Sequence, residues 1–298
     1  VEHRRVSNFV LRAAYVGSQA SHLQLVVQRN PGIFANGGRR TLFPEFQSVI
    51  ENASWATASY HSGQFTLEKR FSQGLQFTAN YTWSKTIDTW SRGSQAFSGG
   101  GIANPFDLNA QRGLSDLHVG HVWVANWVYE SPGLANLPGM VRHTLGGWQL
   151  SGIWRVQSGR PFSIAGGFGN NNSGSLVGGD RADYNGQPLN VKEGEKQDWI
   201  LRYFNTAAFT ANAPGTFGNS GRNILMSPHF NTWDLGISKN WRFQERYRLQ
   251  FRWEMFNALN TPSFGVPNTT PSSQAFGRIA GRGPIPARLM QAALKFYW

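Results

Sequence analysis

The chain has 298 residues, with 28 lysines and arginines, 16 aspartates and glutamates, and no cysteine. It is rich in aromatic residues, with 21 Phe, 8 Tyr and 12 Trp, and its formal charge is +12. This composition is too aromatic for a disordered chain and too poor in charged residues for a coiled coil. No apolar run approaches the ~18 residues of a membrane-spanning helix. Without cysteine, a disulfide framework, a thiolate nucleophile and an all-cysteine metal site are excluded.

The amino-terminal sequence VEHRRVSNFV has neither an initiator methionine nor the regions of a signal peptide. We therefore expect the chain to be a piece of a longer protein. No Pro/Ser linker, charge block or fixed-period repeat divides it, and this favours one domain over residues 1–298.

Apolar and polar residues alternate along many segments, with the period expected of a strand that has two unlike faces. FTLEKRF (65–71) and LQFTANYTWS (75–84) flank a three-residue turn and predict a tight hairpin. WDLGISKNW (233–241) and RYRLQFRWEM (246–255) predict another, and WQLSGIWRVQ (148–157) alternates except at Ile153. HVWVANWVY (121–129) is apolar on both sides, so alternation does not assign its faces. The predicted strands are 8–16, 22–29, 46–53, 60–71, 75–85, 119–130, 147–158, 230–241, 246–257 and 287–298, with the weakest pattern in the second and third.

The connections between these strands differ in length. Short turns at 72–74 and 242–245 alternate with long loops at 86–118, 159–229 and 258–286, and 131–146 is intermediate. An outer-membrane barrel has short periplasmic turns and long extracellular loops, whereas a soluble sandwich has short connections at both ends. Strands of ten to twelve residues also suit the ~9–11 tilted residues that cross a bilayer. We therefore predict an all-β fold, an antiparallel transmembrane β-barrel in the bacterial outer membrane.

Aromatic residues near the predicted strand ends fit the interfacial girdles of such a barrel. The girdle candidates are Phe71, Trp83, Trp233 and Trp241. Packing in a soluble core is the alternative for any one of them. Lys69, Lys85 and Lys239 fall on apolar faces, close enough to strand ends to snorkel towards water.

The carboxyl terminus ends in ALKFYW, with apolar residues at every second position before the last one. A final strand of this kind resembles the signal that bacterial outer-membrane barrels present to their assembly machinery. The candidate signal residues are Met290, Leu294, Phe296 and Trp298. A chance amphipathic strand that ends in Trp is the alternative.

Several blocks resemble the carboxyl-terminal barrel region of TonB-dependent receptors, and the Oar-like group most closely. The blocks are LEKRFSQGLQFTANYTWSKTID, NPFDLNAQRGLSDLHVGHVWV, LGGWQLSGIWRVQSGRPF, FNTAAF, FGNSGRN, FNTWDLGISKN, RLQFRWEMFNALNTPSFG, FGRI and ALKFYW. The resemblance extends from LRAAYVGSQASHL (11–23) to Trp298. It implies a 22-stranded outer-membrane barrel with an amino-terminal plug, which takes up a bulky ligand such as a siderophore, saccharide or peptide with energy from TonB.

The sequence departs from this family in lacking a plug, a TonB-contacting segment and a regulatory domain, and in having about ten predicted strands. An incomplete barrel leaves two unpaired strand edges in lipid, where each unsatisfied backbone group costs several kcal/mol. We therefore expect residues 1–298 to be the carboxyl-terminal portion of the barrel, unable to perform gated transport alone. TonB would act through the missing amino-terminal region, and outer-membrane lipid and the assembly machinery are the other expected partners.

Charged residues on the polar strand faces are expected to line the lumen. The lumen-facing candidates are Arg70, Arg155, Arg246, Arg248, Arg252, Glu68 and Glu254. The arginines would favour an anionic ligand, or they would pair with carboxylates and only stabilise the wall. Trp90, Phe97, Phe168 and Tyr184 in the long loops are candidates for contact with an extracellular ligand, or they pack the loops together.

Enzyme motifs are absent or fail on geometry, so we expect no catalytic residue, no metal site and no cofactor. His118 and His121 would point to opposite faces of a strand. GGFGNNNSGSLVGG (166–179) lacks the context of a phosphate loop and predicts a flexible external loop. Asn219-Ser220-Gly221 lacks the G-x-S-x-G spacing. Asp180 and Asp183 fit a loop turn better than a calcium site, since few acidic residues lie nearby in the sequence.

Two alternative functions stay open at this point. The charge of +12 with interleaved aromatic residues is also typical of a soluble protein that binds single-stranded nucleic acid. The scattered basic residues and the terminal strand argue against nucleic acid as a partner. An outer-membrane adhesin or structural barrel without active transport fits the same strand pattern.

Overall fold

The computed structural model describes most of the chain, in nine segments. For residues 2–6, 142–143, 145 and 196–197 it describes the backbone alone. The described segments are 2–6, 8–91, 102, 104–132, 138–167, 171–177, 179–190, 196–243 and 246–298.

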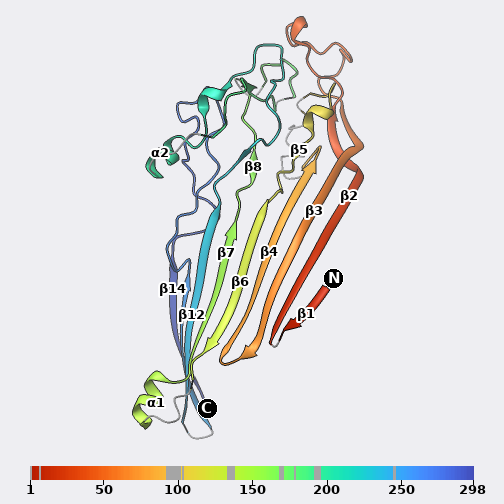
Figure 1. Cartoon of the computed structure of the whole chain (residues 1–298). Coiled ribbons are helices and arrows are strands. Elements are labelled where there is room, and N and C mark those ends of the chain that lie inside the picture. Colours follow the sequence, from red (N-terminus) through yellow and green to blue (C-terminus); the bar gives the residue numbers. More distant parts are fainter. Residues whose placement is uncertain are drawn as a thin grey trace.

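A ten-stranded antiparallel sheet forms the body of the molecule, as the alternation predicted (Figure 1). Each strand pairs with the next one along the path. In spatial order the strands are β1 (Glu2–Val6), β2 (Phe9–Gln28), β3 (Ile50–Ser72), β4 (Leu75–Asp88), β6 (His121–Glu130), β7 (Trp148–Gln157), β12 (Phe230–Phe243), β13 (Tyr247–Phe256) and β14 (Leu289–Tyr297). The short strand β5 (Gly113–Leu114) pairs with the end of β4.

The short and long connections lie at opposite ends of the sheet, which confirms the predicted asymmetry (Figure 1). One end has the connections 7–8, 73–74 and 244–246 and the longer segment that contains helix α1 (Gly139–Leu145). The other end carries four long connections, 29–49, 89–120, 158–229 and 257–288, and helix α2 (Lys196–Leu201) lies among them. We call these the short-turn end and the long-loop end.

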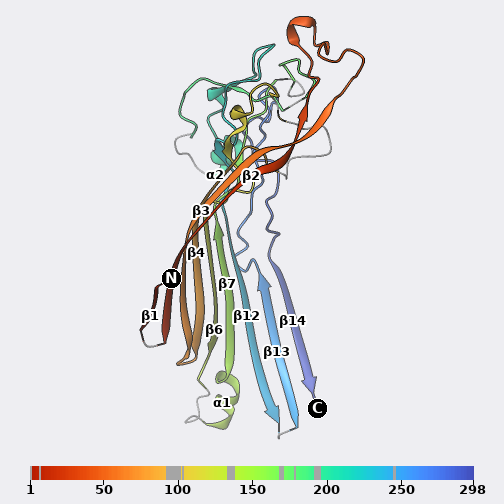
Figure 2. The same ribbon diagram turned by 90° about the vertical axis from the view of Figure 1, so that its right-hand side faces the viewer.

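The prediction of separate strands at 8–16 and 22–29, and at 46–53 and 60–71, was wrong. Each pair is one continuous strand, β2 or β3, and the two strands pair over nearly their full length. GSQAS (17–21) and SWATAS (54–59) contain the small polar residues of a turn, but their backbones bond to each other and continue the ladder, with register shifts at Ala20–Leu25. The resulting hairpin projects beyond the rest of the sheet (Figure 2).

Cross-strand pairing assigns every strand residue to one of two faces, because partners in register share a face and neighbours in sequence do not. Ala13, Phe65, Tyr81, Trp123 and Val156 form one such row across five strands. Trp123, Trp127 and Tyr129 of β6 therefore share the apolar face, and Val122, Val124 and Val128 lie on the polar face. The register thus settles the segment that alternation left unassigned, and it confirms Ile153 on the polar side.

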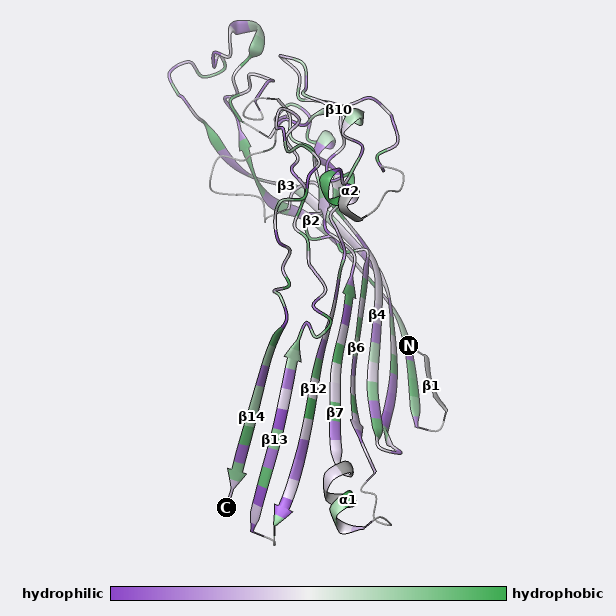
Figure 3. Ribbon diagram, turned by 90° about the vertical axis from the view of Figure 1, so that its left-hand side faces the viewer, coloured by the Kyte–Doolittle hydropathy of each residue, from purple (hydrophilic) through white to green (hydrophobic). Residues whose placement is uncertain are grey.

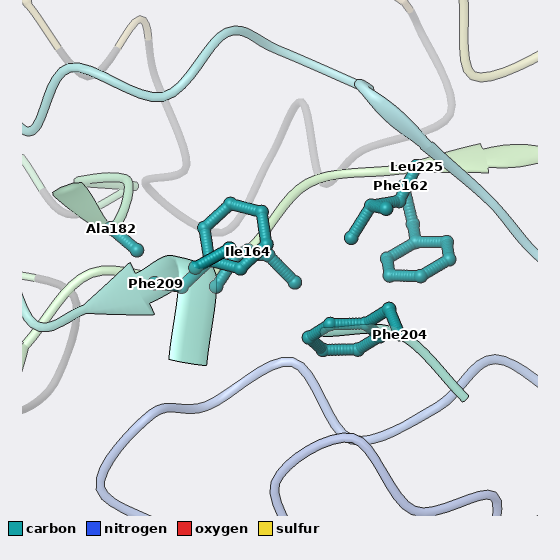
Figure 4. Close-up of a cluster of buried hydrophobic side chains, with 7 residues drawn as sticks. Phe162, Ile164, Ala182, Phe204, Phe209 and Leu225 are labelled. Carbon is teal, nitrogen blue, oxygen red and sulfur yellow. The ribbon is translucent and has the colours of Figure 1, made fainter. Parts of the chain in front are cut away.

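The described parts of the three longest connections pack together at the long-loop end, and we call them the loop assembly. Its core is a cluster of buried side chains from segments far apart in the sequence (Figure 4): Phe162, Ile164, Ala182, Phe204, Ala208, Phe209 and Leu225. Two small sheets lie within it. One joins β8 (Pro161–Phe162) to β11 (Leu225–Met226), and the other joins β9 (Asp183–Tyr184) to β10 (Phe209–Thr210).

A buried ion pair joins the loop assembly to the main sheet. Arg222 pairs with Asp88 at the end of β4, and their side chains are only 11% and 6% exposed. The Arg222 guanidinium also donates to the carbonyl of Gln111 (2.8 Å), the hydroxyl of Ser91 (3.0 Å) and the carbonyl of Leu114 (3.1 Å). One side chain thus ties together three segments that are distant in the sequence.

Arg181 makes a similar junction deeper in the loop assembly. Its guanidinium donates to the carbonyls of Ser220 (2.8 Å) and Ala110 (3.0 Å) and to Oε1 of Gln111 (3.2 Å). Burial, and then the nearby Arg222, lowers the pKa of Arg181, whereas Asp180 raises it. The loop assembly therefore holds two neighbouring cations by means of backbone carbonyls and few carboxylates.

Lysines on the apolar face bind backbone carbonyls at the short-turn end. Lys239 of β12 donates to the carbonyls of Thr144 (2.8 Å) and Gly146 (2.7 Å), and its ammonium lies 5.0 Å from the ring centroid of Trp148. Lys69 donates to the carbonyls of Ser72 (2.8 Å) and Leu75 (2.7 Å) in the same way. The predicted positions near strand ends are confirmed, and both ammonium groups cap turns of the chain.

His118 precedes β6 and lies outside any strand, so the predicted reason why it cannot chelate with His121 was wrong. Its ring is buried and Nδ1 accepts a hydrogen bond from the Thr86 amide (3.2 Å), whereas Nδ1 of His121 meets the Tyr81 hydroxyl (2.8 Å). The two rings have different partners. Burial, followed by the charges of Lys85 and His121, lowers the pKa of His118.

The substitution Arg222→Ala should loosen the loop assembly, because it leaves the Asp88 carboxylate buried and unpaired. Removing one partner of a buried ion pair costs about 3–5 kcal/mol. We expect faster cleavage of the long connections by added protease while the sheet stays folded. The matched control is Arg12→Ala, which breaks the exposed Arg12–Glu68 pair, worth about 0–1 kcal/mol. Equal cleavage rates in the two variants would contradict the assigned role of Arg222.

The substitution Lys239→Met should destabilise the connection that contains α1. The new side chain has a similar length but leaves the Gly146 carbonyl without its donor, at a cost of about 1–3 kcal/mol. We expect that, when samples are incubated at increasing temperatures before electrophoresis, the band of the folded form disappears at a lower temperature than in the unaltered protein. Lys295→Met, in the exposed strand β14, is the control, and no difference between the two variants would refute the capping role.

The contact between His118 and the Thr86 amide should weaken in acid. A histidine with a lowered folded-state pKa stabilises the fold fully above its ordinary value of ~6.5, and the contribution is lost as the pH falls through the folded-state pKa. The rate of amide hydrogen exchange around Thr86, normalised to that of other amides, should therefore rise as the pH falls below ~6.5. The variant His118→Gln should remove the pH dependence, and its persistence in that variant would exclude His118 as the cause.

Candidate functional site

The polar face of the main sheet is hollowed into a cavity of about 310 Å³. Residues of β4, β6, β7, β12 and β13 line this open hollow, so the face is concave across five adjacent strands. One cross-strand row runs through it: Gln76, Val128, Ser151, Gly236 and Glu254. Purple and green segments alternate along these strands in Figure 3, as two unlike faces require.

Apolar and polar residues both line the cavity, and the polar ones include four neutral hydrogen-bonding side chains. Gln76, Thr78, Asn126 and Ser151 supply two amides and two hydroxyls, and sequence reasoning missed them as functional candidates. Their signal was present, since Gln76, Thr78 and Ser151 occupy polar positions of alternating segments, but only charged residues were selected. Asn126 was hidden in the segment whose faces alternation could not assign.

Two carboxylates also line the cavity, and both have partners. Asp234 accepts a hydrogen bond from the backbone N–H of Asn257 (2.8 Å). Glu254 accepts one from Nε2 of Gln291 (2.5 Å), and its Oε1 lies 3.7 Å from Nε of Arg252. Because these carboxylates are partly neutralised, the cavity offers hydrogen bonds rather than a strong field of either sign.

The candidates Arg155, Arg248, Arg252, Glu68 and Glu254 share the polar face. Of these, only Arg252 and Glu254 form an ion pair with each other. Glu68 pairs instead with Arg12 of β2, at 3.5 Å. Both pairs are substantially exposed, and such pairs contribute about 0–1 kcal/mol.

The other candidate arginines lie in different surroundings. Arg155 is exposed and forms no ion pair within the described part of the chain. The guanidinium of Arg248 lies 4.1 Å from the ring centroid of Tyr297. Arg70 lies at a register shift of β3. Arg246 was predicted to begin a strand, but β13 starts one residue later and Arg246 lies in the turn before it.

The girdle candidates Trp83, Trp233 and Trp241 lie on the apolar face, and Trp83 is 62% exposed. Trp233 stacks on Trp154 at 4.9 Å, and Trp154 meets Trp123 edge to face at 5.6 Å. Phe71 lies at the register shift of β3 beside the short turn.

The carboxyl-terminal strand presents Met290, Leu294 and Phe296 opposite Met255, Phe251 and Leu249 of β13, on the apolar face. Trp298 follows the strand and stacks on Phe296, with ring centroids 6.3 Å apart. The outer edge of β14 pairs with no other strand in the described part of the chain, and neither does that of β1, so the sheet is not closed.

The loop candidates that the structure describes are packing residues. Trp90 packs against the buried cluster around Leu25 and Ile102, and Tyr184 packs against Phe209. Phe97 and Phe168 lie outside the described residues. The glycine-rich segment is described in part, and residues 171–177 pack into the loop assembly with Ser173, Ser175 and Val177 buried.

Asp180 and Asp183 serve the loop assembly as hydrogen-bond acceptors. Asp180 is buried and accepts from the amide (2.7 Å) and hydroxyl (2.8 Å) of Ser173. Asp183 accepts from the amides of Asn219 (3.1 Å) and Ala213 (3.2 Å). The described residues include no group of three or more His, Asp or Glu side chains placed to hold a metal ion.

None of the described helices is long and apolar enough to cross a membrane.

Three solved structures resemble this chain at low sequence identity. They are the outer membrane transporter YddB from Escherichia coli (10% identity, TM-score 0.46), the copper transporter OprC (10%, 0.41) and the FrpB iron transporter from Neisseria meningitidis (12%, 0.44). Each match covers 99% of this chain but only 31%, 30% and 30% of the respective structures. This chain therefore spans less than a third of their length. No curated protein sequence matches it.

The family model of the outer membrane beta barrel domain matches residues 1–291, nearly the whole chain. The match agrees with the antiparallel sheet, its two unlike faces and the opposite placement of short and long connections. The chain belongs to the family of outer-membrane β-barrel domains.

Proposed function

We propose that this chain forms the carboxyl-terminal part of the barrel of a TonB-dependent receptor, which takes up a bulky ligand across the outer membrane. The observation that carries the proposal is the concave polar face with its cavity of about 310 Å³, since a concave polar wall is suited to line a water-filled lumen. Membership in the outer-membrane barrel family supports it and disfavours a soluble nucleic-acid-binding protein.

In this proposal the remaining strands and a plug belong to a preceding part of a longer protein, through which TonB would act. The open edges of β1 and β14 are consistent with such a completion, because unpaired edges are costly in lipid. Phe71, Trp83, Trp233 and Trp241 would form the membrane girdle. Met290, Leu294, Phe296 and Trp298 would be read by the barrel assembly machinery.

The mixed lining of the cavity, in which apolar side chains lie beside hydrogen-bonding groups, favours a saccharide or peptide ligand over a simple anion. Gln76, Thr78, Asn126 and Ser151 can donate and accept hydrogen bonds, and the described lining residues include no lysine or arginine to bind an anion. The lumen-facing arginines would attract negative charge elsewhere on the wall, above all at Arg155, which lacks an ion-pair partner in the described residues.

An adhesin without active transport is the second candidate. It is favoured by apolar side chains that are exposed near the tip of the projecting β2–β3 hairpin (Figure 2), namely Leu42, Phe43 and Phe46. Deleting TonB in the native host should abolish uptake of labelled saccharides or peptides if the chain transports them. If cells show no uptake even with TonB present, and their attachment to surfaces is the same after the deletion, the adhesin is favoured.

Single cysteines should reveal which face meets water, because the chain has none of its own. In the intact protein in cells, Asn126→Cys and Ser151→Cys should react with a membrane-impermeant maleimide. The sequence neighbours Ala125→Cys and Leu150→Cys lie on the opposite face and should be protected by lipid. Labelling of the two lipid-side controls alone would overturn the lumen assignment.

A further inference from the structure

The apolar face carries a compact group of aromatic and basic side chains towards its long-loop end. Tyr15, Trp83 and His121 share one cross-strand row with Gly63, and His61 and Lys85 are partners in the adjacent row. We call Tyr15, His61, Trp83, Lys85 and His121 the outward patch. All five side chains are exposed, and they lie on interior strands of the sheet, so additional strands at its edges would not cover them.

Two tyrosine–histidine pairs orient the rings of the patch. The Tyr15 hydroxyl lies 2.6 Å from Nδ1 of His61, and the Tyr81 hydroxyl lies 2.8 Å from Nδ1 of His121. In each pair the two rings are stacked with centroids 6.1 Å apart. When the tyrosine donates to Nδ1, the imidazole proton resides on Nε2. Both histidines then keep an N–H group that can donate to a ligand.

Glycines leave an open place in the middle of the patch. Gly63 lies between Tyr15 and Trp83 in its row, and a side chain added there would first meet the ring of Phe65, at 3.5 Å. Gly17 is the row partner of His61, and the Tyr15 hydroxyl lies only 2.8 Å from the position of a Cβ at Gly17. The tyrosine can thus lean across Gly17 to reach His61. A ligand group could approach the sheet beside Lys85 without displacing a side chain.

The charge of this face has one sign. Its positions on the four strands around the patch, odd-numbered residues 9–19, 59–69, 75–87 and 121–129, include no Asp or Glu. Lys85 and His121 both lie close enough to His118 to lower its pKa, so these two side chains lie near one another. The nearest carboxylates along β4 and the loop before β6 are engaged elsewhere, Asp88 by Arg222 and Asp116 by Asn223.

The patch lies at the height of a membrane interface. Ten residues separate Lys85 from Leu75 beside the short turn, which is roughly 33 Å along the strand at about 3.3 Å per residue and roughly 25 Å in height for a strand tilted by about 40°. The apolar band of an outer-membrane barrel is about 25 Å tall. Below the patch the same face presents Leu11, Phe65, Leu67 and Ala79, so that a lipid held at the patch would lay its acyl chains on apolar side chains.

We propose that the outward patch binds the phosphorylated headgroup of a lipid in the leaflet next to the long loops. Lys85 supplies the fixed charge, Nε2 of His61 and of His121 donate hydrogen bonds, and Tyr15 and Trp83 border the site. The proposal is independent of transport, since it concerns the opposite face of the sheet.

The test measures retained lipid on the intact protein, purified in neutral detergent and offered diphosphorylated lipid A, with native mass spectrometry as the readout. A basic residue at a membrane surface contributes about 1 kcal/mol, so Lys85→Gln should weaken binding about fivefold, and Lys85→Arg should restore it. His61→Gln should weaken it as well. Lys295→Gln removes the same charge from the polar face and should leave lipid binding unchanged. Heat-modifiable gel migration verifies that every variant is folded.

The outcomes separate the sources of phosphate. Preference for lipid A over its dephosphorylated form, lost in Lys85→Gln and His61→Gln, supports the site. Equal binding of both forms would show that the acyl chains alone are recognised and would overturn the proposal. Displacement of lipid A by an equal concentration of inorganic phosphate would identify a site for the free ion instead and would overturn the lipid assignment.

Discussion

Hydrogen bonding between neighbouring strands is the constraint on which the rest of this structure depends. A bilayer offers no water to an unpaired backbone group, so each strand must satisfy its amides and carbonyls on the strands beside it. The resulting register is also what gives the sheet two chemically different faces, because a slip of one residue would exchange them. The row that joins Phe65, Tyr81 and Trp123 shows the effect, since it aligns apolar side chains from three strands.

The two ends of the sheet satisfy their remaining polar groups in different ways. At the short-turn end, Lys69 and Lys239 donate to carbonyls of the connections, and the Lys239 ammonium also lies beside the ring of Trp148. At the long-loop end, the connections build a core of their own around Phe204 and bury Arg222 against Asp88. This ion pair joins a loop to the end of a strand 134 positions away, so the loop assembly and the sheet support each other.

Charge is divided between the faces as well. Glu68, Asp234 and Glu254 lie on the polar face, where Glu68 and Glu254 meet arginines, and amides and hydroxyls lie beside apolar side chains in the cavity. The apolar face has cations towards its two ends and aromatic side chains around them. The polar concave wall and the apolar surface with cationic rims, for which we propose separate functions, are carried by the same strands.

The sequence by itself determined the fold class, because alternation and connection length are local properties of an amphipathic strand. It also determined the face of residues such as Arg155, Trp233 and Ile153 relative to their own strand. The tertiary structure decided what depends on a partner. It showed that β2 and β3 continue through segments that look like turns, and it assigned the faces of β6. It also brought Arg222 to Asp88 and gathered Gln76, Asn126 and Ser151 around one cavity. The physical reason is that register and loop packing are set by contacts between residues distant in the chain, and alternation within one segment carries no information about its partner.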